Sequence, residues 1–328
     1  MSPSRPYAHV AADGVTRVFG SRRHNRLVAV DAVSVEIDST SMIGIVGESG
    51  SGKSTLARLL VGLDRPTSGT VLYGGRGLDL LSRSAWKDFR REVQIVAQDT
   101  SSSFDPRRSL RDAVRLPAVQ LCGLGTAEAD ARVDRTLELL GVPPALAQRR
   151  PGEVSGGQRQ RFALARALVV EPRLLVCDEV VSALDVSVQG TILNLLKRYC
   201  RENEAGLVFV SHGLPATAFI ADRLVVMHRG RIVEQGATTD LLDAPAHPYT
   251  AALLQAHHGR PPGGRRDAVL PDPARESWAC RYAPSCPRAV DTCRTERPPL
   301  ADHAGRTVAC HVPVDAPLLA GAGAGGPR

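Results

Sequence analysis

The chain contains 328 residues, of which 43% are apolar and 23% are charged. This is an ordinary globular composition, and it excludes wholesale disorder as well as collagen-like and coiled-coil architectures. The formal charge of +7 rests almost entirely on arginine, because Lys53, Lys87 and Lys197 are the only lysines. We give this bias little weight as a sign of phosphate or lipid contact.

The chain length and the pattern of apolar residues also limit the class of protein. Two domains of about 150 residues would fit, as would one α/β core of about 250 residues with an appendage. No apolar run reaches the roughly 18 residues that a membrane-spanning helix needs. The first residues lack the apolar stretch of a signal peptide. We therefore expect a cytosolic protein, in which the seven cysteines do not form a disulfide framework.

Strands and helices are expected to alternate along most of the chain. Residues 28–37 alternate apolar and polar side chains, as in a half-buried strand, and residues 42–46 are a continuous apolar run before a glycine-rich turn. Helical spacing follows at 56–61. Further buried strands are expected at 93–96, 174–177, 207–210 and 224–227, and helices between them at 156–169 and 187–201. This order predicts an α/β core with helices on both faces of the sheet, and a mostly helical subdomain inserted at about 105–165.

The turn after residues 42–46 carries a phosphate-binding motif. Gly47-Glu-Ser-Gly-Ser-Gly-Lys-Ser54 matches G-x-x-x-x-G-K-[ST], and its place between a strand and a helix makes the match credible. Backbone N–H groups would cradle the phosphates, Lys53 would reach the β- and γ-phosphates, and Ser54 would ligate Mg²⁺. The ATP-binding residues predicted in this segment are Gly47, Glu48, Ser49, Gly50, Ser51, Gly52, Lys53, Ser54 and Thr55.

A second motif places two acids at the end of a strand. The apolar residues 174–177 are followed by Asp178 and Glu179, where the carboxyl end of a parallel strand would meet nucleotide. Asp178 would hold the metal through water, and Glu179 would orient or deprotonate the attacking water. Together with the phosphate loop, these acids predict an ATP-hydrolysing site.

Residues 154–161, Val-Ser-Gly-Gly-Gln-Arg-Gln-Arg, resemble the signature peptide of ATP-binding cassette (ABC) ATPases, and the first 255 residues are similar to that family throughout. The resemblance implies a RecA-like P-loop NTPase core with a mostly parallel sheet, an antiparallel β subdomain and a helical signature subdomain. It also implies that the signature contacts the γ-phosphate of nucleotide held by an opposite subunit, so that ATP holds a dimer together. A serine, two glycines and a helix N-terminus suit such an anion cradle, and they are Ser155, Gly156, Gly157 and Gln158.

The same resemblance assigns further roles. Gln98 is implied as the glutamine that senses Mg²⁺ and water, and with Ser54 and Asp178 it completes the metal site. His212 is implied as the switch histidine beside the γ-phosphate, so that Glu179, His212 and Gln98 form the catalytic set. Asp185 lies in the inter-subunit loop 182–185. Phe19, placed 28 residues before Gly47, would stack on adenine, and a packed core position is the alternative for it.

Other segments resemble one branch of the family more closely. Residues 99–107, 177–189 and 246–254, together with the cysteine-rich tail, resemble the ATP-binding subunits of dipeptide, oligopeptide and nickel importers. Ala97, Thr100, Val180 and Gly213 depart from the residues usual at those positions, which leaves their effect on turnover open. None of these four replaces a catalytic group.

The tail concentrates four cysteines, Cys280, Cys286, Cys293 and Cys310. A cytosolic module this small lacks a hydrophobic core of its own, and a bound metal would stabilise its fold. Four thiolates suit a [4Fe-4S] cluster, which related importer subunits can hold. Reduced thiols without metal are the second interpretation, and zinc is the third, because the spacings of five and six residues are wide for a zinc ribbon.

We therefore expect an ABC ATPase domain at 1–256, a linker at 257–276, a cysteine-rich module at 277–313 and a disordered tail at 314–328. The expected function is ATP hydrolysis in a peptide-class importer at the cytoplasmic face of the membrane. The implied partners are a second ATP-binding subunit, two permeases and an extracytoplasmic substrate-binding protein, without nucleic acid. A soluble ABC-type ATPase acting on nucleic acid is the alternative. A non-hydrolysing regulatory cassette is opposed by Glu179 and His212. The transported solute, and whether the partner cassette is identical, cannot be read from the sequence.

Overall fold

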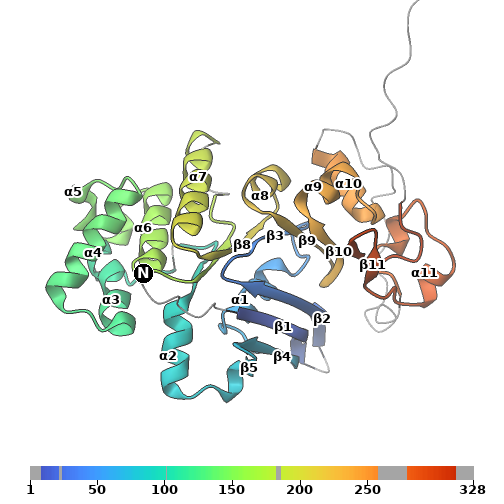
Figure 1. The fold of residues 1–328 in the computed structure, drawn as a ribbon, viewed down its shortest axis with the longest axis horizontal. Coiled ribbons are helices and arrows are strands. Elements are labelled where there is room, and N and C mark those ends of the chain that lie inside the picture. The colour runs from blue at the N-terminus through green and yellow to red at the C-terminus, as the bar shows by residue number, and fades with distance from the viewer. Residues whose placement is uncertain (1–8, 22–23, 101, 182–185, 258–278, 315–328) are drawn as a thin grey trace, which may run out of the picture.

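The computed structural model describes residues 9–21, 24–100, 102–181, 186–257 and 279–314. Its elements lie in three groups along the longest axis, namely a block of helices, a central pair of sheets and the C-terminal segment, residues 279–314 (Figure 1). The strands are β1 (His9–Ser21), β2 (His24–Asp38), β3 (Met42–Val46), β4 (Ser68–Tyr73), β5 (Arg76–Gly77), β6 (Val93–Val96), β7 (Leu174–Asp178), β8 (Gly206–Ser211), β9 (Arg223–His228), β10 (Arg231–Ala237), β11 (Ala301–His303) and β12 (Arg306–Val308). The helices are α1 (Lys53–Leu60), α2 (Arg83–Glu92), α3 (Leu110–Cys122), α4 (Thr126–Leu139), α5 (Pro144–Ala147), α6 (Gly156–Leu168), α7 (Val186–Glu202), α8 (Leu214–Ile220), α9 (Thr238–Asp243), α10 (Pro248–His257) and α11 (Thr292–Thr295).

Two sheets form the centre of the molecule. The larger has eight strands in the order β11-β12-β10-β9-β3-β8-β7-β6. Its strands from β9 to β6 run parallel, and β10, β12 and β11 continue it in antiparallel fashion. A separate antiparallel sheet has the order β2-β1-β4-β5. Every buried strand that the sequence predicts lies in the larger sheet, so the predicted α/β fold with a mostly parallel sheet and an antiparallel β subdomain is confirmed.

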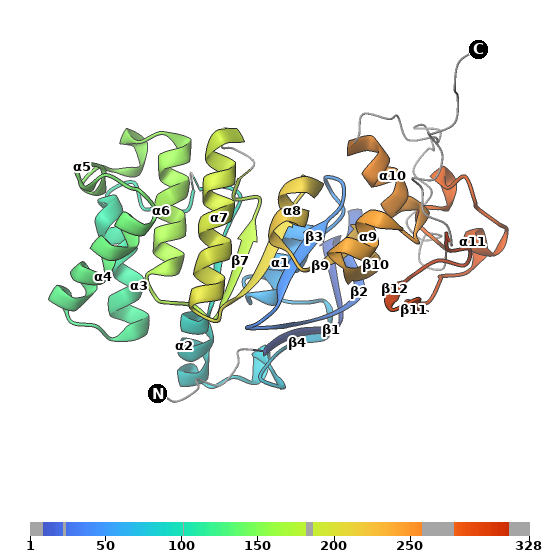
Figure 2. The ribbon, with the colours of Figure 1, turned by 45° about the horizontal axis from the view of Figure 1, so that its top comes forward.

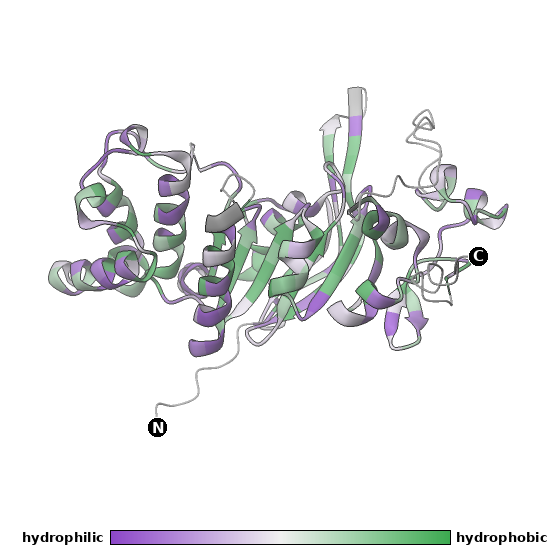
Figure 3. Ribbon diagram, turned by 90° about the horizontal axis from the view of Figure 1, so that it is seen from above, coloured by the Kyte–Doolittle hydropathy of each residue, from purple (hydrophilic) through white to green (hydrophobic). Residues whose placement is uncertain are grey.

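The parallel strands are buried on both faces, which explains their nearly continuous apolar sequences. Successive side chains point to opposite faces. Val208 and Val210 therefore pack in the layer that contains α1 and the antiparallel sheet. Leu207 and Phe209 pack in the layer formed with α6 and α7. Figure 3 shows the result, with apolar strands in the middle and polar residues concentrated on the helices around them.

Helices α3 to α6 form a block at one end of the molecule, beside the edge of the larger sheet (Figure 2). Serines stabilise the starts of two of these helices by accepting backbone N–H bonds. Ser109 accepts from Asp112 at the start of α3, and Ser155 accepts from Gln158 at the start of α6. No helix in the described ranges is long and apolar enough to cross a membrane.

The C-terminal segment is joined to the core by backbone hydrogen bonds. β12 pairs with β10, so that Val308 lies opposite Glu234. The N–H of Ala309 donates to the carbonyl of Val233, and the N–H of Val314 donates to that of Ala246, both at 2.8 Å. The larger sheet therefore continues into the segment that contains the four cysteines. The predicted linker at 257–276 and tail at 314–328 lie outside the described residues, apart from His257 and Val314.

A buried glutamate ties this junction together. Glu234 is 0% exposed, and its two carboxylate oxygens accept the N–H groups of Ala246 at 2.8 Å and His247 at 2.9 Å. The Arg306 guanidinium lies 3.7 Å from the same carboxylate. One side chain thus connects β10, the residues before α10, and β12.

Replacement of Glu234 by Ala is expected to lower the free energy of unfolding by about 3 kcal/mol or more. The change leaves two buried N–H groups without acceptors and removes the counter-charge of Arg306. Urea denaturation followed by circular dichroism measures the loss. Glu36→Ala is the control, because that side chain is 82% exposed. An equal effect of the two substitutions would contradict this role of Glu234.

Candidate active site

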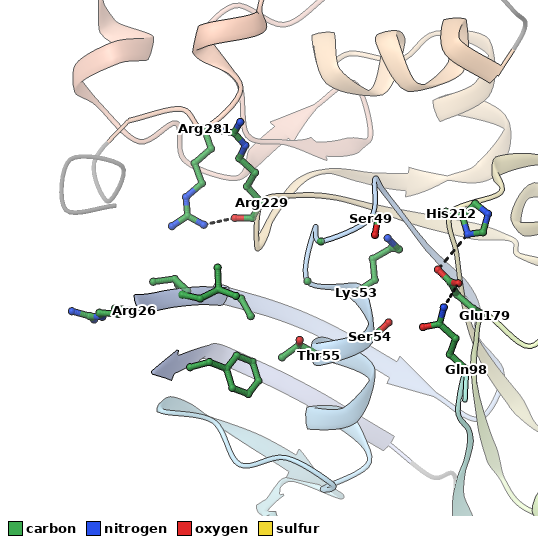
Figure 4. A pocket seen from close by; sticks show the side chains of 16 residues that line it. Arg26, Ser49, Lys53, Ser54, Thr55, Gln98, Glu179, His212, Arg229 and Arg281 are labelled. Carbon is green, nitrogen blue, oxygen red and sulfur yellow. Dashed lines mark hydrogen bonds and ion pairs between the residues drawn. The ribbon is translucent and has the colours of Figure 1, made fainter. Parts of the chain in front are cut away.

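A cavity of about 950 Å³ lies at the junction of α1, β2 and the turn between β9 and β10 (Figure 4). Its walls combine predicted and unpredicted residues. The predicted ones are Phe19, Ser49, Gly50, Gly52, Lys53, Ser54, Thr55, Gln98, Glu179 and His212. The others are Arg26, Leu27, Val28, Ala29, Arg229 and Arg281.

The loop before α1 requires glycine at two positions. A Cβ at Gly47 would lie 2.2 Å from the carbonyl oxygen of Met227. Gly52 has a φ of 99°, and a Cβ there would lie 2.2 Å from the carbonyl oxygen of Ala29. Gly52 is also the N-cap residue of α1, and no side chain caps this helix end. The N–H groups of the first helical turn are therefore available to bind an anion.

Lys53 begins α1, and its side chain turns back into the loop. Its side chain is buried, and Nζ donates to the carbonyl oxygens of Gly47 at 2.7 Å and Glu48 at 2.8 Å, and to Ser51 Oγ at 3.3 Å. Burial lowers the pKa of Lys53, while the nearby carboxylates, Glu179 first among them, act in the opposite direction. The ammonium group thus lies where bound phosphates would meet the loop.

Ser54 and Asp178 form a pair of oxygen donors beside the loop. Ser54 Oγ donates to Asp178 Oδ1 at 3.0 Å, and Asp178 is only 4% exposed. Burial raises the pKa of Asp178, although the Ser54 hydrogen bond opposes the shift. The Ser54 hydrogen bond only partly offsets the cost of burying the Asp178 carboxylate. A hydroxyl and a carboxylate placed in this way supply the oxygen ligands that Mg²⁺ prefers. The structure therefore joins two of the three predicted metal residues directly.

Glu179 is held between the other two catalytic candidates. Gln98 Nε2 donates to Glu179 Oε2 at 2.7 Å, and His212 Nδ1 lies 3.3 Å from Glu179 Oε1 (Figure 4). The N–H of Glu179 donates to the carbonyl of Val210 at 2.9 Å. Its φ of 51° is unfavourable for a residue with a side chain. Such strain is typical of functional positions that the surrounding structure fixes.

Phe19 also lines the cavity. The residue is 38% exposed, lies opposite Leu27 in the register of β1 and β2, and has the Arg17 guanidinium 4.7 Å from its ring centroid. The alternative of a packed core residue does not fit this exposure. Phe19 is instead a cavity-lining residue, and an aromatic ring at such a place can stack on a planar group.

The signature residues lie elsewhere. Ser155, Gly156, Gly157 and Gln158 form the first turn of α6, and none of them lines the cavity. Ser155 and Gln158 bond reciprocally, since the Gln158 N–H donates to Ser155 Oγ at 3.3 Å and the Ser155 N–H donates to Gln158 Oε1 at 2.9 Å. Ser155 and Gly156 are exposed. Asp185 lies outside the described residues.

Three of the four departures from the family pattern directly neighbour cavity-lining residues in the sequence: Ala97 is beside Gln98, Val180 is beside Glu179 and Gly213 is beside His212. Thr100 and Val180 are buried, and Gly213 precedes α8 and donates its N–H to Ser211 Oγ at 3.0 Å. Neither these three residues nor Ala97 is among the residues that line the cavity.

None of the four cysteines of the tail forms a disulfide in this structure. The Cys280 N–H donates to the carbonyl of Cys293 at 2.9 Å. Burial, with the other three thiols adding to it, raises the pKa of Cys310 to about 11. Among the described residues, no group of three or more His, Cys, Asp or Glu side chains is arranged to hold a metal ion. The [4Fe-4S] prediction therefore has no support from this geometry.

Sequence reasoning missed six cavity residues. Arg26 to Ala29 lie in the strand predicted at 28–37 or just before it, and strand periodicity does not say which neighbours line a cavity. Arg229 is a turn residue with a φ of 45°. Arg281 lies 228 positions after Lys53 in the sequence, and no local pattern connects the two.

Comparisons with known proteins agree with this geometry. The ABC transporter family matches residues 30–182, and the oligopeptide/dipeptide transporter C-terminal region matches residues 233–293. A putative peptide import ATP-binding protein of Brucella abortus is 42% identical over 312 residues, covering 92% of this chain and 93% of the relative. The di/tripeptide transport ATP-binding protein DppF of Pseudomonas aeruginosa is 39% identical over 293 residues, covering 88% and 91%.

Solved structures with the same fold include a dimeric ATP-binding cassette in a post-hydrolysis state bound to ADP and Pi. It is 27% identical, with a TM-score of 0.65, and the match covers 70% of this chain and 98% of that one. The cbiO1 protein of Clostridium perfringens, part of the cbiONQ transporter complex, is 27% identical with a TM-score of 0.60, covering 71% and 89%.

Proposed function

This chain belongs to the ABC transporter family, and from that membership we propose the assembly in which it works. The chain is an ATPase and the ATP-binding subunit of a peptide importer of the dipeptide class. We place it at the cytoplasmic face of the membrane, paired with a second ATP-binding subunit and bound to two permeases. An extracytoplasmic binding protein would deliver the peptide. The comparisons give the nucleic acid alternative no support.

One observation carries the proposal of active hydrolysis. Glu179 is held by Gln98 and His212 in a cavity whose wall is the phosphate-binding loop. A carboxylate with this placement can orient a water molecule and accept its proton. A regulatory cassette that only binds nucleotide would not need this arrangement.

The proposed reaction is in-line transfer of the γ-phosphoryl group to water. The loop N–H groups and Lys53 would stabilise charge on the β- and γ-phosphates, while the bond between the γ-phosphorus and the bridging oxygen breaks. Glu179 would take the proton of the attacking water. Gln98 and His212 would hold Glu179 in position, since both bond to its carboxylate.

Ser54 and Asp178 would hold Mg²⁺, together with Gln98. When bound, this ion supplies positive charge at the phosphate oxygens. The support for this assignment is the buried Asp178 carboxylate beside the Ser54 hydroxyl.

A second subunit would complete the site. The N-cap and first turn of α6 offer Ser155, Gly156, Gly157 and Gln158, of which the first two are exposed and none lines the cavity of its own chain. We propose that they bind the γ-phosphate held by the partner, in agreement with the dimeric form of the related cassette bound to ADP and Pi.

Transport in proteoliposomes tests the whole assignment. The chain is reconstituted with permeases and a binding protein of the dipeptide class from the same organism, and uptake of a labelled dipeptide is measured. We expect uptake that requires ATP and ATP hydrolysis that peptide stimulates. Hydrolysis that responds to DNA and to no peptide would contradict the proposal.

A further inference from the structure

The cysteine-rich C-terminal segment contributes a side chain to the nucleotide cavity. Arg281 follows directly after Cys280, and it lines the same cavity as Lys53 and Phe19. Figure 4 shows Arg281 on the cavity wall next to Arg229, at the end away from Glu179. The segment therefore borders the site in which ATP is hydrolysed, although it lies outside the two nucleotide-binding motifs.

Arg281 is buried in this wall and hydrogen-bonded to its neighbours. Its side chain is 8% exposed, Nη2 donates to Asp31 Oδ2 at 2.8 Å, and Nη1 donates to the carbonyl of Arg229. Arg231 donates to the same Asp31 oxygen at 2.8 Å, and Arg297 Nη1 lies 3.7 Å from Oδ1. The Asp31 carboxylate thus forms ion pairs with two arginines of the C-terminal segment and with one arginine of β10.

The turn that contacts Arg281 also contacts the phosphate-binding loop. The N–H of Gly230 donates to the carbonyl of Ser51 at 2.8 Å, and the N–H of Asp31 donates to the carbonyl of Gly230 at 2.9 Å. Two consecutive residues of this turn, Arg229 and Gly230, therefore connect Arg281 with the loop that binds phosphate.

A second connection runs through aromatic rings. The Tyr249 hydroxyl accepts the N–H of Glu48 in the phosphate-binding loop at 3.0 Å. Tyr282, the residue after Arg281, lies with its ring centroid 5.4 Å from those of both Tyr249 and His228. Burial lowers the pKa of His228 to about 4, so this ring packs as a neutral group. The C-terminal segment is therefore packed against the base of the loop as well as against the cavity.

We infer that Arg281 is a nucleotide-binding residue, and that nucleotide occupancy stabilises the docked position of the C-terminal segment. The ligand is the anionic adenosine nucleotide of the proposed function, on which this inference rests. A guanidinium offers only donors, and it suits the ribose and α-phosphate oxygens. Because Arg281 lies away from Glu179, its contribution is equal for ATP and ADP. By linkage, a nucleotide that binds the docked segment better must also stabilise that docking.

A purely structural role is the competing explanation, because Arg281 also anchors the segment to Asp31. Arg297 supplies the matched control. It bonds the same residue, through the carboxylate and through the Asp31 carbonyl at 3.2 Å, but it does not line the nucleotide cavity. Loss of either arginine weakens the contact with Asp31, whereas only the loss of Arg281 removes a group from the cavity.

Calorimetric titration of the full chain with ADP and with a non-hydrolysable ATP analogue measures how much Arg281 contributes to nucleotide affinity. Arg281→Gln is expected to weaken both ligands by about 10-fold, because a charge-assisted hydrogen bond is lost. Arg281→Lys should recover part of this loss, and Arg297→Gln should change either affinity by less than about 2-fold. Hydrogen exchange of residues 279–297 measures whether nucleotide stabilises the docked position of the C-terminal segment. ADP should slow this exchange in the wild type and in Arg297→Gln, and it should have no effect in Arg281→Gln.

Two results would overturn the inference. One is wild-type affinity in Arg281→Gln. The other is an equal loss in both glutamine variants with faster exchange of the segment in nucleotide-free protein, which would leave Arg281 a structural role alone. The wild type and Lys53→Ala separate this outcome from failure of the proposed function. If the wild type does not bind nucleotide, or if Lys53→Ala binds it normally, the site assignment itself is wrong.

Discussion

Glu179→Gln is expected to bind ATP normally and to hydrolyse it on the order of 100-fold more slowly, or slower still. The amide keeps the shape of the side chain but cannot accept a proton from water, so the base is lost while the phosphate-binding loop is unchanged. Since ATP persists, the bound nucleotide should hold two subunits together. Phosphate release measures turnover, and size-exclusion chromatography with ATP measures the dimer.

Glu202→Gln is the control for this variant. That glutamate lies on α7 with 65% of its side chain exposed, so its substitution should leave both turnover and assembly unchanged. Near-normal hydrolysis by Glu179→Gln would remove Glu179 from the catalytic role. A variant that is inactive yet stays monomeric with ATP would contradict the nucleotide-held dimer.

The second large effect concerns the signature helix. Lys53→Ala and Ser155→Arg are each expected to abolish hydrolysis in a homodimer, because the first removes the cation of the loop and the second blocks the anion cradle. A dimer with one subunit of each kind contains one composite site with Lys53 and Ser155 intact, and a second site with both lesions. We therefore expect up to about half of wild-type activity to return, since a two-fold dimer has two equivalent sites.

Two different affinity tags allow the mixed dimer to be isolated before its activity is measured. Each single variant, carried through the same purification, is the control. Recovery of activity only in the mixed dimer is the expected result. A mixed dimer of demonstrated composition that remains inactive would show that the signature does not serve the partner's nucleotide.

Much of the nucleotide site was predictable because its chemistry is local in sequence. The loop that ends in Lys53 and Ser54 needs glycine at fixed positions, and the two acids at the end of β7 follow directly from a continuous apolar run. The structure adds that the Glu179 carboxylate bonds both Gln98 and His212. From the sequence, those two residues could be placed only by family resemblance, since a single glutamine or histidine carries no pattern of its own.

The C-terminal part was much less predictable, because its structure depends on pairing between distant residues. β12 has three residues and pairs with β10 about 70 positions earlier in the chain, and such a short strand has too little periodicity to detect. Cysteine spacing pointed to a separate metal-bound module. Neither the burial of Glu234 against Arg306 nor the approach of Arg281 to the nucleotide cavity leaves a signal in sequence spacing.

The pairing of β12 with β10 has a further consequence for the surface of the molecule. Without residues 301–308, β10 would be the last strand on its side of the sheet, and its outer N–H and C=O groups would face solvent. An open strand edge of this kind is a template for pairing with other chains. The hairpin of β11 and β12 replaces the seven-residue β10 at this edge by the three-residue β11, and a short edge strand offers less of a template for edge-to-edge association.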